Sequence, residues 1–124
     1  MKRHSNQPLE GDTKKAVEEY LIANRFMFIR NQQMRVSAKL KDGRPQFIKL
    51  PEYQLGCADF IVFRRPMFRN SLDGMQLLPA VAVEIKSHNG RQSEDQKLWQ
   101  ARFQKTGGIY LIVRKVEDLE KILA

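Results

Sequence analysis

Three charged residues lie in or beside apolar, strand-like segments, where core packing alone would not place them. Asp59 opens the segment DFIVF, and Glu84 and Lys86 lie at the end of AVAVEIK. Alternate residues of a strand share one face, so Glu84 and Lys86 point the same way, whereas Val83 and Ile85 point the other way. Burying a carboxylate and an ammonium is costly unless they pair or bind a metal. This pattern predicts a site rather than a packing arrangement.

The chemistry that this set could perform is metal-dependent phosphodiester hydrolysis. Two carboxylates from adjacent strands supply hard oxygen ligands for Mg²⁺, with water and phosphate filling the other positions. A metal there would polarise the phosphate and lower the pKa of a bound water. Lys86 would orient the nucleophile and offset developing negative charge. The alternative is a surface ion pair of Glu84 and Lys86 on an edge strand, with Asp59 a simple turn residue.

The elements that must position these residues follow from apolar periodicity and from turn and capping residues. Helices are predicted over 12–24, 93–105 and 116–123, and strands over 26–29, 60–63, 80–85 and 109–113. Asp12 or Thr13 is expected to cap the first helix. Residues 34–50 alternate around Asp42-Gly43, which predicts a hairpin, and 64–78 should form a loop or irregular hairpin. Together they predict an α/β fold, a mixed central β-sheet flanked by helices.

The predicted middle helix adds a further candidate site residue. Ser93 and Gln96 have the S-x-x-Q spacing of a capping box. Gln96, Trp99 and Phe103 share one helical face, and the aromatic residues must pack on the sheet. Gln96 therefore either caps its own helix or faces the carboxylates, and both interpretations stay open.

Charge indicates a polyanionic partner. The 124 residues contain 22 Lys and Arg against 14 Asp and Glu, a formal net charge of +8. A small domain this basic commonly binds nucleic acid, because neutralising phosphates releases counterions. No basic amphipathic helix suggests a membrane surface instead. The candidate phosphate contacts are Arg30, Asn31, Arg64, Arg65 and Arg69.

The length of the chain and the absence of several known motifs further restrict the class of protein. We expect a flexible basic arm over 1–11 and a single domain over 12–124. The lone Cys57 cannot form an internal disulfide, and no zinc pattern is present. Walker A, GxGxxG, HExxH and GxSxG motifs are absent, so no nucleotide cofactor is expected. The chain shows no secretory signal and no membrane-length apolar run, which predicts a cytoplasmic protein with no membrane partner.

Several short segments, taken in order and spacing, carry a resemblance to a known family. They are GCAD at 56–59, EIKS at 84–87, Gly90 followed by Ser93, Gln96 and Trp99, and GGIYLIVRKVEDLEKIL at 107–123. With the YL that ends the first helix and the Arg30-Asn31 pair, the chain resembles the VRR-NUC family. The similarity is greatest to its stand-alone members, which are frequent in phage and prophage genomes.

The resemblance implies a restriction-endonuclease-like core of the PD-(D/E)xK superfamily and hydrolysis of DNA with Mg²⁺ or Mn²⁺. It also implies a homodimer that cuts four-way (Holliday) junctions in a bacterial cell. By position, Asp59 and Glu84 look like metal ligands, with the Ile85 backbone carbonyl as a third. Lys86 resembles the catalytic lysine, and Gln96 the family's helix glutamine near the metal.

Two positions depart from the family pattern. Ala58 stands where the PD motif would have proline. The acidic residue expected early in the first helix falls on Asp12, where a glutamate is usual, and Glu10 or Glu18 could take that role instead.

Two other functions remain open from the sequence. The chain could be a basic nucleic-acid-binding module that has kept the fold without turnover. Alternatively, it could be a nuclease that acts on linear duplex or flap DNA.

Overall fold

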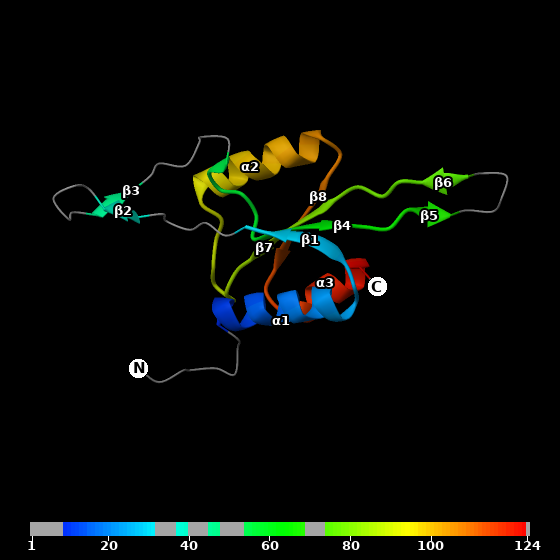
Figure 1. The fold of residues 1–124 in the computed structure, drawn as a ribbon, viewed down its shortest axis with the longest axis horizontal. Helices are drawn as coiled ribbons and strands as arrows, with labels where there is room; N and C mark the ends of the chain where they lie inside the picture. Colours follow the sequence, from blue (N-terminus) through cyan, green and yellow to red (C-terminus); the bar gives the residue numbers. More distant parts are fainter. Residues whose placement is uncertain (1–8, 32–36, 40–44, 48–53, 69–73, 124) are drawn as a thin grey trace.

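The computed structural model describes residues 9–31, 37–39, 45–47, 54–68 and 74–123 (Figure 1). Its helices are α1 (Glu10–Ala23), α2 (Glu94–Lys105) and α3 (Val116–Leu123). The central strands are β1 (Met27–Arg30), β4 (Phe60–Phe63), β7 (Val81–Ile85) and β8 (Ile109–Val113). Two short pairs complete the fold: β2 (Ser37–Lys39) with β3 (Pro45–Phe47), and β5 (Met67–Phe68) with β6 (Met75–Gln76).

The central sheet is mixed and has the order β1-β4-β7-β8. β1, β4 and β7 pair antiparallel, whereas β8 lies parallel to β7. Parallel pairing of consecutive strands needs a long crossover, which α2 provides. The α/β architecture with a mixed sheet flanked by helices is therefore confirmed.

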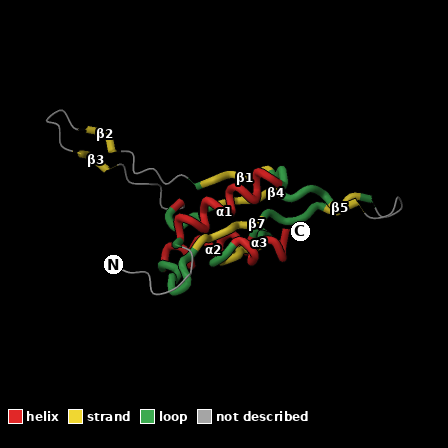
Figure 2. Tube along the Cα trace, turned by 90° about the horizontal axis from the view of Figure 1, so that it is seen from below, coloured by secondary structure: helices red, strands yellow, loops and turns green. Residues whose placement is uncertain are grey.

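Helices cover both faces of this sheet. Figure 1 shows α2 above it and α1 and α3 below, and Figure 2 views the same layers from the α1 side. Val81, Val83 and Ile85 of β7 join the larger apolar cluster, with residues of α1 and α3. Ala82 joins the smaller cluster on the α2 face, against which Trp99 and Phe103 pack. All of β7 is buried, as the sequence predicts for a strand covered on both faces.

The first helix begins two residues earlier than predicted, at Glu10. Leu9 occupies the N-cap position without a side-chain cap, so the expectation that Asp12 or Thr13 caps the helix is wrong. Thr13 instead lies in the first turn, where its backbone N–H donates to the Leu9 carbonyl at 3.0 Å. Acidic side chains in the first turn favour this start, because they interact with the positive end of the helix dipole. The domain therefore includes residues 9–11, which the sequence assigned to the arm.

Both predicted hairpins are present as short antiparallel pairs at opposite ends of the molecule (Figures 1 and 2). The segments between the paired strands, 40–44 and 69–73, lie outside the described residues, as do residues 1–8. Within the described part of the chain, no helix is long and apolar enough to cross a membrane.

Candidate active site

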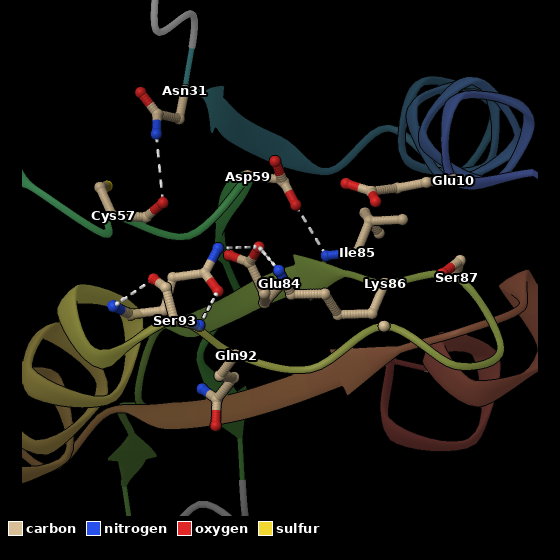
Figure 3. A network of polar contacts seen from close by, with 12 residues as sticks. Glu10, Asn31, Cys57, Asp59, Glu84, Ile85, Lys86, Ser87, Gln92 and Ser93 are labelled. Atoms are coloured by element: carbon tan, nitrogen blue, oxygen red, sulfur yellow. Dashed lines mark hydrogen bonds and ion pairs between the residues drawn. The ribbon is translucent and has the colours of Figure 1, made fainter.

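The predicted carboxylates lie where β4 and β7 separate. The ladder between these strands ends at the pair Phe60–Val83, so Asp59 and Glu84 come immediately beyond it. The Asp59 carboxylate replaces a backbone partner, because its Oδ2 accepts a hydrogen bond of 2.7 Å from the Ile85 N–H (Figure 3). Two acidic residues 25 positions apart in the sequence are thereby held at one end of the sheet.

Glu84 is a buried carboxylate with one oxygen left over. Its residue is only 3% exposed. Oε1 accepts a hydrogen bond of 2.9 Å from the Gln96 amide and lies 3.7 Å from the Lys86 Nζ. Among the described residues, Oε2 is the buried side-chain oxygen or nitrogen without a hydrogen-bond partner. A buried oxygen of this kind is costly unless something outside the protein chain pairs with it.

The electrostatics of Glu84 reflect this burial. Loss of solvation, reinforced by the neighbouring Asp59 charge, raises the pKa of Glu84 to about 8, although Lys86 acts in the opposite direction. A carboxyl group in this position therefore resists ionisation until a further positive charge reaches it.

Lys86 follows directly after β7. Its backbone N–H donates to the Val113 carbonyl at 3.0 Å, and its side chain is 13% exposed. Because β7 lies between β4 and β8, the Glu84–Lys86 pair is an interior pair. The alternative of a surface ion pair on an edge strand is therefore wrong.

Gln96 serves both of the roles that the sequence left open. Its side-chain Oε1 accepts from the Ser93 N–H at 2.8 Å, and its backbone N–H donates to Ser93 Oγ at 3.2 Å, which completes the capping box. Its Nε2 remains available and donates to Glu84. The cap thus fixes the amide orientation that holds the buried carboxylate.

The first helix brings Glu10 and Lys14 to the same place. Lys14 Nζ lies 3.2 Å from Asp59 Oδ1 and 3.6 Å from Glu10 Oε1. Glu18 is occupied elsewhere, since its Oε2 accepts from Arg30 at 2.6 Å. Asp12 is exposed and does not line the cleft described below, so the structure favours Glu10 over Asp12 as the helix acid near the site.

Asp59, Glu84, Gln96 and the two residues of α1 line an open cleft of about 830 Å³, and Lys86 is not among its lining residues. Its walls come from α1, the end of β1, the segment before β4, the end of β7 and the start of α2. The lining residues are Glu10, Lys14, Arg30, Asn31, Leu55, Gly56, Cys57, Asp59, Glu84, Ser93, Asp95 and Gln96.

The donor set suits a hard divalent cation. The carboxylate oxygens at the cleft are the unpartnered Glu84 Oε2 and those of Asp59 and Glu10, which have partners in Ile85 N–H and Lys14. The Ile85 carbonyl faces the same edge of β7 as its N–H, which meets Asp59. Within the described ranges, no three Asp, Glu, His or Cys side chains already surround a common point. Mg²⁺ is commonly held by one or two carboxylates together with several waters, so a pair of carboxylates such as Asp59 and Glu84 could hold it only with water completing the coordination.

Arg114, which holds a loop of the site, was missed from the sequence. Arg114 Nη1 donates to the carbonyls of Ser87, His88 and Gly90, at 2.5, 3.2 and 2.9 Å, and so fixes the loop after Lys86. The parallel pairing of Ile85 with Val113 is the signal that could have located it, because it places the two strand ends side by side.

Asn31 and Gly56 position the segment that carries Asp59. The Asn31 N–H donates to the Asp59 carbonyl at 2.7 Å, and its side-chain amide donates to the Cys57 carbonyl at 3.2 Å. Gly56 has φ +77°, and a Cβ there would collide with the backbone of Asp95 and Gln96. Glycine is thus required for the close approach of this loop to α2.

The predicted arginine contacts do not form one group. Arg30 lines the cleft, where Glu18 pairs with it. Arg64 and Arg65 lie beyond the other end of β4, about 16 Å and about 20 Å from Asp59 at about 3.3 Å per residue. There Arg64 Nε donates to the Pro79 carbonyl at 3.1 Å. Arg69 lies outside the described residues.

Comparison of the chain with protein-family models, with curated proteins and with solved structures gives no significant match. The functional assignment therefore depends on the residues and geometry of the site.

Proposed function

We propose that the chain is a divalent-metal-dependent DNA endonuclease that hydrolyses phosphodiester bonds, with four-way junctions as its substrate. The observation that carries this proposal is the Glu84 carboxylate. It is 3% exposed, has an oxygen without a partner, and lies beside a second acid where two strands separate. Such an arrangement is costly for folding and useful for holding a cation.

Each residue of the site would have a distinct part in the proposed reaction. Asp59, Glu84 and the Ile85 carbonyl would hold Mg²⁺ or Mn²⁺, which when bound supplies Lewis-acid activation of the phosphate and of a water. Lys86, whose Nζ lies 3.7 Å from Glu84 Oε1, would orient the attacking water and offset negative charge on the phosphate. Gln96 fixes the orientation of Glu84 through a hydrogen bond that its own helix cap preorganises.

The wider molecule supports the same assignment. The mixed sheet with a parallel crossover strand is compatible with the restriction-endonuclease-like core that the sequence resemblance implies. The net charge of +8 suits a DNA partner. We propose a homodimer, because two-fold symmetry allows paired cuts in opposed strands of a junction. In keeping with the same resemblance, we assign it to the cytoplasm of a bacterial cell, encoded by a phage or prophage.

One observation favours a second candidate, a non-catalytic nucleic-acid-binding module. Both Asp59 oxygens already have partners within the chain, the Ile85 N–H and Lys14. A protein that never binds metal could use such internal pairing as its final state. This module would bind DNA equally with and without metal.

The test compares cleavage of labelled four-way junction, linear duplex, flap and single strand, each with Mn²⁺, Mg²⁺ or EDTA. The proposal predicts metal-dependent paired cuts at the junction, lost in Glu84→Gln. Glu94→Gln is the matched control, because the Glu94 side chain is 86% exposed on the surface of α2. Metal-independent junction binding without cutting would establish the binding module, and preferential cutting of linear or flap DNA would change the substrate class.

A further inference from the structure

Lys14 places a positive charge at the carboxylates of the site, and neither the catalytic scheme nor the sequence patterns assign it a role. Its ammonium lies 3.2 Å from Asp59 Oδ1 and 3.6 Å from Glu10 Oε1. The side chain is about one third exposed, at 33%, so it reaches into the cleft from the wall rather than from bulk solvent.

The helix fixes this reach. Thr13 and Val17, on either side of Lys14 along α1, are buried at 3% and 0% exposure. Glu10 and Lys14 are one helical turn apart and therefore share a face. Because α1 is anchored through its buried residues, Lys14 is held against Asp59, whereas its neighbour Lys15 is exposed.

The contact has a consequence for any cation that binds here. Asp59 Oδ2 accepts from the Ile85 N–H, and Oδ1 is paired with Lys14. A divalent ion that approaches Asp59 Oδ1 meets the Lys14 ammonium at the same oxygen, and the two positive charges repel each other. The lysine is the more easily displaced partner, since its flexible side chain can turn to solvent while the Ile85 N–H is fixed in β7.

We propose that Lys14 is an internal counter-ion that occupies Asp59 in the metal-free protein and competes with the divalent metal for it. The inference rests on the proposed metal site. Its presence lowers the affinity of the site for metal and offsets the negative charges of Glu10 and Asp59 before metal binds. On metal binding the ammonium leaves Asp59 and stays at the cleft wall, tethered to α1.

The experiment measures Mn²⁺ binding by electron paramagnetic resonance and calorimetry at pH 7.5, without DNA. Lys14→Met should bind Mn²⁺ about tenfold more tightly than the unaltered chain, the size expected when a charged hydrogen bond no longer has to be broken. Lys15→Met removes the same charge from the exposed position beside it and should change the affinity much less. Lys14→Arg retains a cation and should leave the affinity low.

The controls separate this inference from the proposed function. Equal Mn²⁺ affinities for Lys14→Met and Lys15→Met, or weaker binding by Lys14→Met, would overturn the role of Lys14 while leaving the metal site intact. Loss of Mn²⁺ binding in Glu84→Gln identifies the signal as that of the site. Absence of binding in both the unaltered chain and Lys14→Met would overturn the metal site and the counter-ion together. Circular dichroism establishes that each variant is folded before binding is compared.

Discussion

The two faces of the central sheet are packed with different kinds of side chain. The face toward α1 and α3 is filled with larger aliphatic and aromatic residues, among them Leu21, Phe60 and Leu119, all fully buried. On the α2 face, the buried residues of the cluster are Ala58, Ala82 and Tyr110. The same strand, β7, thus has branched aliphatic side chains on one side and Ala82 and Glu84 on the other.

Polar contacts accompany the small residues of the α2 face. Gln96 donates to Glu84, and Gln92 Nε2 donates to the Tyr110 hydroxyl at 3.1 Å. Small side chains at Ala58 and Ala82 let α2 approach the sheet closely, so its polar groups can reach a buried carboxylate. This difference indicates that the face toward α1 and α3 stabilises the fold, whereas the α2 face lowers the stability because it carries the site.

Glu84→Gln should produce the largest effect, because it removes a proposed metal ligand from the α2 face. We expect cleavage to fall by at least about a thousandfold, and thermal stabilisation by Mn²⁺ to disappear. Above about pH 8, where Glu84 is ionised, the metal-free variant should melt at a higher temperature than the unaltered chain, since a neutral amide is cheaper to bury than a carboxylate. Melting curves with EDTA and with Mn²⁺ check this. A lower melting temperature in EDTA at this pH for Glu84→Gln than for the unaltered chain would contradict the conclusion that the α2 face lowers the stability.

The same residue predicts how metal-free stability depends on pH. The folded-state pKa of Glu84 is raised from 4.5 to about 8, so between these values the folded state binds more protons than the unfolded state. Stability contributed by Glu84 is therefore present in full below about pH 4.5 and is lost as pH rises through about 8. Urea unfolding in EDTA across this range measures the slope. In Glu84→Gln the contribution should vanish, and an unchanged slope would exclude Glu84 as its source.

Leu119→Ala tests the other face. Leu119 of α3 is fully buried in the larger cluster, and its truncation should lower the free energy of unfolding by about 3 kcal/mol. Because Leu119 packs in the apolar cluster on the face of the sheet opposite Glu84, the folded variant should keep its Mn²⁺ affinity. Denaturant unfolding and Mn²⁺ titration check the two halves of this prediction. A matching loss of metal affinity would show that the two faces are not independent.

The smallest expected effect is the difference in cleavage activity between Gln96→Ala and Ser93→Ala. Both variants break the capping box, which should lower stability by about 1 kcal/mol. Only Gln96→Ala also removes the hydrogen bond to Glu84, so it alone should reduce cleavage, by about 10- to 100-fold. Steady-state cleavage beside thermal melting separates the two effects. Equal losses of activity in both variants would mean that Gln96 acts only as a cap.

Much of the fold could be predicted from local pattern. The apolar segments of β4, β7 and β8, the stop at Gly107-Gly108 and the capping box of α2 each depend on residues close together in the sequence. The alternation that places Glu84 opposite Val83 and Ile85 is also local, and the burial of these residues agrees with it.

The remainder depends on contacts that no local pattern encodes. Lys14 meets Asp59 across 45 positions, and Arg114 meets the loop at Gly90 across 24. The helix acid could not be chosen from the sequence, because Glu10, Asp12 and Glu18 all lie in one helix. In the structure Asp12 does not line the cleft and Glu18 pairs with Arg30, whereas Glu10 lines the cleft beside Lys14.

The most direct test of the metal site is a crystal structure of the chain with Mn²⁺, located by anomalous scattering. We expect an anomalous peak between the Asp59 and Glu84 carboxylates, at about 2.1 Å from an oxygen of each, with Lys14 turned away from Asp59. Crystals at saturating Mn²⁺ with no peak there, Lys14 still paired with Asp59 and Glu84 Oε2 still unpaired would contradict it.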